Sequence, residues 1–132
     1  MFKNEIIKAS YKEVQTILKS FMEDIHVVEI DGKHIQSWED YILEIETKMR
    51  FPTTCIDSID RYLDWITDLE WLGKNSYVLI IYNFADFMEN NPDIKNLIIK
   101  RFKEHILPWW QEDVEEFSAG GKRKPFNVYL VD

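Results

Sequence analysis

The chain is predicted to fold as one small α/β domain around a mainly parallel sheet. Its 132 residues, of which 45% are apolar and 30% charged, are too few for two ordinary domains and too apolar for a disordered chain. Short apolar runs alternate with longer segments of helical periodicity, and strands separated by helices are joined by crossovers that leave the strands parallel. We therefore expect a single domain over 1–132, in two or three layers.

The first predicted elements are a helix and a short strand. A capping-box pattern begins at Ser10, and the apolar residues after it recur at helical spacing, which predicts a helix over about 11–24. The β-branched run 26–30 predicts a strand, and the pair Asp31-Gly32 predicts a turn that follows this strand.

Two helices are predicted next. An apolar stripe with the spacing i, i+3, i+4, i+7 and i+11 starts at Trp38 and predicts a helix over about 38–49. Pro52 disfavours helical structure at the residue before it. A further helix is predicted over about 58–71, ending near Gly73, because glycine commonly terminates helices.

The C-terminal half is predicted to hold two strands and one helix. The run 77–82 is apolar on both alternating faces, which is typical of a central strand of a parallel sheet. A helix is predicted over about 92–106, with Pro108 marking its end. The acidic, glycine-containing and then basic stretch 111–125 predicts an exposed, flexible loop, and 126–131 predicts the last strand.

Composition and charge narrow the classes of function. The chain has 16 Lys and Arg against 24 Asp and Glu, so its net charge of -8 repels nucleic-acid phosphate and anionic lipid but attracts a basic partner. Its longest apolar run is far shorter than the roughly 20 residues that span a bilayer. The single cysteine, Cys55, cannot close an intramolecular disulfide, and no signal peptide begins the sequence. We expect a cytoplasmic monomer that binds neither nucleic acid nor membrane.

Motifs for catalysis and for cofactors are missing from the sequence. The three histidines, His26, His34 and His105, form no zinc-ligand pattern. The four glycines are spaced for neither a dinucleotide-binding motif nor a P-loop, and no nucleophile elbow is present. We therefore expect no cofactor, no metal ion and no enzymatic activity.

One predicted helix carries a row of acidic residues. Asp57, Asp60, Asp64 and Asp68, which we call the acidic edge, fall within roughly 80° of one another on a helical wheel. Aspartate is a poor helix former, and acids four residues apart repel each other. The helix dipole accounts for the first two acids but not for Asp64 and Asp68. Aromatic residues nearby strengthen the prediction of an interface for a basic partner, and the alternative is a solvated helix face.

Several segments together resemble the barstar family of intracellular inhibitors of the ribonuclease barnase. The resemblance lies in Ile30-Asp31-Gly32, Phe51-Pro52, Ile59-Asp60 and Leu63-Asp64, and downstream in the strand 77–82 with Asn83-Phe84, in Phe102-Lys103-Glu104 and in the strand 126–131. It covers about 26–132 and excludes the predicted N-terminal helix, so residues 1–25 would be an addition to the family pattern.

The resemblance implies both a fold and a mechanism. Family members have a three-stranded parallel sheet packed by helices, and they inhibit by laying an acidic helix and the loop before it across the nuclease active site. By this resemblance Asp60 and Asp64 match the two inhibitory aspartates, and Asp64 would take the place of a substrate phosphate. Glu104 would match a peripheral acid on the last helix.

The sequence departs from the family in the loop before the acidic helix. Thr54, Cys55 and Ile56 stand where the family typically has aromatic residues and a glycine, and Leu63 replaces a frequent tryptophan. These positions help to select the partner. The predicted contacts with a basic ribonuclease or related toxin are Asp60, Asp64, Asp57, Thr54, Cys55, Asp68 and Glu104.

Two other functions remain open at this point. An acidic adaptor would bind an unrelated protein through the helix 11–24 or through Trp109 and Trp110, with no nuclease involved. An enzyme would use the aspartates as metal ligands or as acid–base groups, and would show turnover or a thermal shift with divalent metal.

Overall fold

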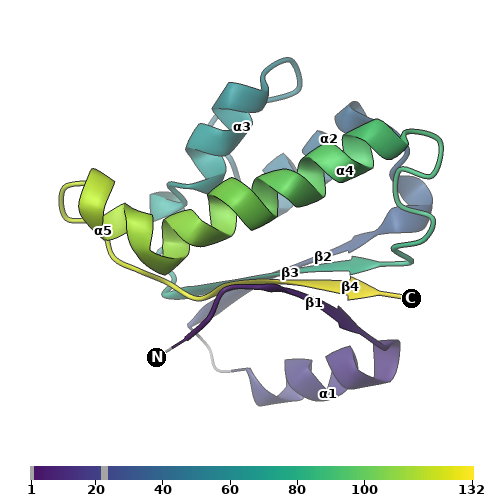
Figure 1. Ribbon diagram of the computed structural model, residues 1–132, viewed down its shortest axis with the longest axis horizontal. Coiled ribbons are helices and arrows are strands. Elements are labelled where there is room, and N and C mark those ends of the chain that lie inside the picture. Colours follow the sequence, from purple (N-terminus) through teal and green to yellow (C-terminus); the bar gives the residue numbers. More distant parts are fainter. Residues whose placement is uncertain (1, 22–23) are drawn as a thin grey trace.

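A four-stranded, all-parallel sheet forms the middle layer of the computed structural model, which describes residues 2–21 and 24–132 (Figure 1). The strand order is β1-β4-β3-β2, with β1 at Ile6–Ala9, β2 at Ile25–Asp31, β3 at Ser76–Tyr82 and β4 at Phe126–Val131. One face of the sheet carries α1 (Tyr11–Ser20) alone, and the other carries α2 (Trp38–Lys48), α3 (Ile59–Ile66), α4 (Pro92–Arg101) and α5 (Val114–Phe117) (Figure 1).

The prediction of three strands is wrong by one, because the N-terminal segment holds a strand as well as a helix. In β1, Ile6 lies beside Val128 of β4. This strand has only four residues, one of them Lys8, so its sequence pattern is too short to be distinguished from a loop. The predicted helix over 11–24 ends at Ser20, because Phe21 has extended backbone angles. Residues 22 and 23 lie outside the described residues.

The helix α1 is needed to cover the second face of the sheet. Its apolar side packs on side chains from that face, forming a small core whose buried members are Val14, Val78, Ile80 and Val131. The other side chains of β3 enter a larger core under α2, α3 and α4. This division explains why the run 77–82 is apolar on both faces, and it confirms that β3 is a buried interior strand.

The last helix is longer than predicted. Helical structure continues from α4 through two π-helical segments, Phe102–Ile106 and Trp109–Asp113, into α5. Pro108 therefore does not end the helix. The Leu107 N–H already bonds to the carbonyl of Phe102, five residues back, and such wide turns relieve the crowding that a proline ring causes in an α-helix.

The predicted flexible loop 111–125 is accordingly helical as far as Phe117. Its composition is polar, but Trp110 and Val114 lie one turn apart on the buried side of the helix, and this packing outweighs the loop-like composition. Only the stretch from 118 to 125 lacks helix and strand.

The helix α3 is shorter than the predicted 58–71. It ends at Ile66, and Leu69 then adopts a left-handed conformation with φ of 54°. The Thr67 hydroxyl donates back to the carbonyl of Leu63 at 2.6 Å, a bond typical of a helix end. Asp57 and Asp68 therefore flank α3 instead of belonging to it.

No helix among the described residues is long and apolar enough to cross a membrane.

Gly32, which follows β2, provides a test of the packing at this end of the sheet. A methyl group at this position would lie 2.5 Å from the carbonyl oxygen of Asn83 and 2.9 Å from Cβ of Phe87. We expect Gly32→Ala to lower the free energy of unfolding by about 1–3 kcal/mol, because the backbone must move to relieve the overlap. Urea denaturation beside the exposed neighbour variant Lys33→Ala measures this loss, and equal stability of the two variants would contradict it.

Candidate functional site

The acidic edge is displayed by α3 and the residues on either side of it. The helix begins after Ser58, whose side chain accepts a hydrogen bond from the Arg61 N–H, as an N-cap does. Asp60 and Asp64 are exposed and lie one turn apart. Tyr62 and Ile66 are buried on the opposite side. The structure thus confirms that these acids face solvent.

The carboxylates of the acidic edge are mostly free of cations. Across residues 2–21 and 24–132, no Lys, Arg or His lies within salt-bridge distance of Asp60, Asp64 or Asp68. Arg61 turns towards the preceding loop, where its Nη1 lies 3.5 Å from Asp57 and donates to the carbonyl of Thr54 at 3.1 Å. The edge therefore presents unneutralised negative charge.

The loop before α3, residues 53–58, is fixed from beneath by a carboxylate. Glu46 on α2 accepts the Thr54 hydroxyl at 3.2 Å with one oxygen and the Cys55 N–H at 3.0 Å with the other. Such bonds to backbone and side chain together hold the loop in one conformation before any partner arrives.

Two tryptophans hold the same loop from its sides. The indole N–H of Trp38 donates to the carbonyl of Ile56 at 3.0 Å, and that of Trp65 donates to the Thr53 hydroxyl at 3.0 Å. The Trp65 ring also meets Trp71 edge-on, with centroids 5.4 Å apart. These aromatic residues support the loop more than they project from it, because each is partly buried.

The inner side of α3 is anchored in the core. The hydroxyls of Tyr41 and Tyr62 lie 2.7 Å apart, and burial raises the pKa of both phenols, so each stays protonated and can donate. At its end, the Ile66 carbonyl accepts the indole N–H of Trp110 at 3.1 Å. The last helix thereby fixes the position of α3.

A groove lies beside the end of α3. It has a volume of about 610 Å³ and runs between the acidic edge and the segment that follows α5. Its lining includes the carboxylates of Asp64, Asp68 and Glu70, the indole of Trp109, and the two lysines Lys122 and Lys124. A groove with carboxylates and an indole ring suits a basic side chain.

The remaining predicted contacts have different surroundings. Thr54 is exposed, whereas the side chain of Cys55 is buried with 0% exposure, so only its backbone could meet a partner. Asp68 accepts the Glu70 N–H at 3.2 Å and so shapes the turn after α3. Glu104 belongs to the last helix, where its carboxylate lies 4.0 Å from Lys100.

Sequence reasoning missed the residues that position the loop. Glu46 and Trp38 lie outside the loop 53–58, in the predicted helix 38–49, where the sequence pattern indicates only a helix and its apolar stripe. Nothing in the local pattern marks Glu46, because its function depends on where α2 packs. The structure also removes Trp110 from the candidate adaptor surface, since it is only 3% exposed.

The buried thiol gives a direct test of how well the loop is ordered. Burial, and to a lesser degree the Glu46 carboxylate, raise the pKa of Cys55 to about 11. Because the thiolate is the reactive form, we expect Cys55 of the folded protein to resist iodoacetamide at neutral pH while urea-unfolded protein is labelled. Mass spectrometry of both samples measures this, and equally fast labelling of the folded protein would show that the loop is open.

A model of the family described as Barstar (barnase inhibitor) matches residues 25–130. That span contains β2, β3, all of β4 except Val131, and every helix except α1, and it includes the acidic edge and its supporting loop. No curated protein and no solved structure gives a significant match to the chain. Among the described residues, no group of three or more His, Cys, Asp or Glu side chains is placed to hold a metal ion.

Proposed function

Because the chain belongs to the barstar family, whose members are non-enzymatic inhibitors of barnase-like ribonucleases, we propose that it blocks the active site of a basic ribonuclease or related toxin with α3 and the loop 53–58. It would do so as an immunity protein inside the cell that makes the toxin. The observation that carries this proposal is the pair of exposed, unpaired carboxylates of Asp60 and Asp64 on a helix that the core holds rigidly.

The charge pattern suits a nuclease active site. Such a site binds RNA phosphate with Arg, Lys and His side chains, and a carboxylate supplies a similar negative group with two acceptor oxygens. Asp64 would take the position of a phosphate, with Asp60 one turn away at a neighbouring cation. A basic side chain from the nuclease would enter the groove between Asp64, Asp68 and Trp109.

A fixed loop and helix would strengthen binding without adding contacts. Ordering a flexible loop on binding costs free energy that is subtracted from affinity. Here the bonds from Glu46, Trp38 and Trp65 place the loop in advance. Its exposed surface, which includes Thr53 and Thr54, is small and polar, so the partner should differ from nucleases recognised through aromatic side chains.

Added salt should slow association much more than it speeds dissociation. The net charge of -8 attracts a basic protein over distances up to about a Debye length, and added salt shortens that range. Stopped-flow measurement of both rate constants at rising ionic strength tests this. An association rate that does not change with salt would mean that charge does not guide the encounter.

Capture of the partner tests the proposed function directly. The native protein and the Asp60→Ala/Asp64→Ala variant are immobilised, and lysate and secreted proteins of the source cells are passed over both at low and moderate salt. We expect a small basic nuclease, identified by mass spectrometry, on the native protein alone. Retention of the same partner by both forms, or of a partner that is not basic, would reject the proposal.

A further inference from the structure

The two edges of the sheet differ in whether their main-chain groups bond to side chains. At the β2 edge, the Lys48 ammonium donates to the carbonyl of Glu29 at 2.6 Å, and the His26 ring bonds to the carbonyl of Lys48 at 2.9 Å. The end of α2 therefore lies along that edge and satisfies one of its main-chain carbonyls. An element that covers an edge hinders its pairing with another strand.

The β1 edge is open by comparison. The Glu5 carbonyl accepts the Val128 N–H at 3.1 Å on the β4 side, so the alternation of a strand turns the main-chain groups of Ile6 and Lys8 outwards. No side chain in the described part of the chain hydrogen-bonds to the main chain of these two residues. Ile6 and Lys8 thus offer donors and acceptors for one more strand.

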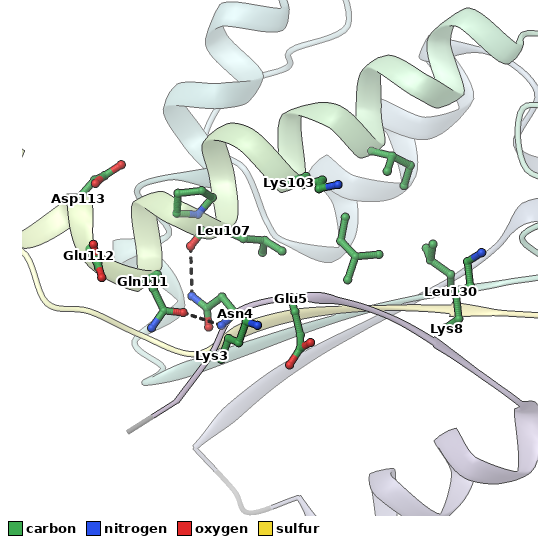
Figure 2. A pocket seen from close by; sticks show the side chains of 13 residues that line it. Lys3, Asn4, Glu5, Lys8, Lys103, Leu107, Gln111, Glu112, Asp113 and Leu130 are labelled. Atoms are coloured by element: carbon green, nitrogen blue, oxygen red, sulfur yellow. Dashed lines mark hydrogen bonds between the residues drawn. The ribbon is translucent and has the colours of Figure 1, made fainter.

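A cleft of about 710 Å³ lies along this edge, between β1 and the last helix (Figure 2). We call it the β1 cleft. Its middle is apolar, formed by Ile6, Ile99, Leu107, Pro108 and Leu130. Hydrogen bonds close its floor at one end, where Asn4 donates from its backbone to Gln111 at 2.6 Å and from its side chain to the carbonyl of Leu107 at 3.3 Å (Figure 2).

The charged side chains are unevenly distributed along the β1 cleft. Figure 2 shows Lys8 and Lys103 towards one end and Glu112 and Asp113 towards the other. Three lysines and three acids line the cleft in all, so its formal charge is zero on a chain that carries -8. Lys3 lies at the acidic end, and the Glu5 side chain points away from the helix (Figure 2). The cleft is therefore neutral as a whole, but its two ends differ in charge.

A two-fold axis beside β1 gives an antiparallel pair of strands. Centred on Ile6, it would place Lys8 beside Asn4 of the second copy, and would turn the end of the cleft with Lys103 towards the end with Glu112 and Asp113. In such a self-complementary interface each contact occurs twice.

We propose that two copies of this chain associate through the β1 cleft, with β1 pairing antiparallel to β1 of the second copy. The pairing would extend the sheet across both copies and cover the apolar middle of the cleft with the same residues of the second copy. The interface is separate from the acidic edge, because β1 and α3 lie on different sides of α4 in Figure 1. Dimer formation should therefore leave the acidic edge exposed to a partner.

Charge reversal tests this arrangement by sedimentation velocity at concentrations from low to several hundred micromolar. The native protein should reach a mass twice the 15.9 kDa of one chain. Lys8→Glu/Lys103→Glu and Glu112→Lys/Asp113→Lys should each raise the dimer Kd by about tenfold or more, because like charges then meet at both ends. An equimolar mixture of the two variants should dimerise again, since every contact in the mixed dimer joins opposite charges.

The control is Lys12→Glu/Lys19→Glu, on the exposed side of α1. It changes the net charge as much as Lys8→Glu/Lys103→Glu does, and it should leave the dimer intact. Circular dichroism of every variant establishes that it is folded. A native protein that stays monomeric throughout would overturn the proposal, and the cleft would then serve another occupant. Charge-reversed variants that still dimerise, or a mixture that does not, would overturn it as well.

Discussion

Replacing Asp64 by alanine should weaken binding of the cognate ribonuclease by about 2 kcal/mol or more, roughly 30-fold or more in Kd, a hot-spot range to which complexes of this same family contributed. The Asp64 carboxylate is exposed and forms no ion pair with the residues that the structure describes, so it is available to a partner. In the complex its removal would leave a nuclease cation buried and unpaired, which is the costly consequence.

A matched variant separates this effect from a general loss of charge. Asp57→Ala removes one negative charge from the same edge, but Asp57 already lies 3.5 Å from Arg61 and outside α3. Its loss should change the binding free energy by less than about 1 kcal/mol. Isothermal titration calorimetry of the two variants against one nuclease measures both. Native-like affinity of Asp64→Ala would remove Asp64 from the interface.

Replacing Tyr62 by alanine should lower the free energy of unfolding by about 3–5 kcal/mol. Tyr62 is 1% exposed, and its ring lies edge-on to Trp38 and Tyr41, with centroids 5.4 and 5.8 Å away. The substitution would leave a large cavity beneath α3 and deprive the Tyr41 hydroxyl of its partner. Because domains of this size are stable by only about 5–15 kcal/mol, the variant would retain little of the native free energy of unfolding.

Two further variants separate the contribution of the ring from that of the hydroxyl. Urea denaturation followed by tryptophan fluorescence measures the free energy of unfolding of each. Tyr62→Phe keeps the ring but removes the hydroxyl, and should cost about 1–3 kcal/mol for the unpaired Tyr41 group. Tyr11→Ala changes the same residue type where it is 62% exposed and should cost much less than Tyr62→Ala. Equal losses for Tyr11→Ala and Tyr62→Ala would mean that α3 is not anchored through Tyr62.

Local signals in the sequence predicted most elements, because their causes are themselves local. The capping box at Ser10 is present as two reciprocal bonds with Glu13, and Ser37 caps α2 through the Asp40 N–H. The strand 126–131 has the predicted bounds. Two of the errors arise from tertiary contacts: β1 is too short to show a pattern without its neighbour β4, and packing of Trp110 carries the last helix past Pro108.

The site was predictable only in its charge. A helical-wheel projection places Asp60 and Asp64 on the solvent side, because the apolar residues between them must face the core. The supporting bonds from Glu46, Trp38 and Trp65 join residues 9 to 18 positions apart that belong to different segments, so no helix or strand spacing rule indicates them. The burial of Cys55 is not predictable from the local pattern either, because its side chain joins a core whose other members come from several elements.

The central claim is that α3 blocks a nuclease active site, and titration of RNA cleavage tests it most directly. Increasing amounts of this protein are added to a fixed amount of the captured nuclease, and the cleavage of a fluorescent RNA is followed. The account predicts a linear loss of activity that is complete at one inhibitor chain per nuclease, and no loss with Asp60→Ala/Asp64→Ala at the same amounts. Full activity at excess native protein, or equal inhibition by the variant, would contradict it.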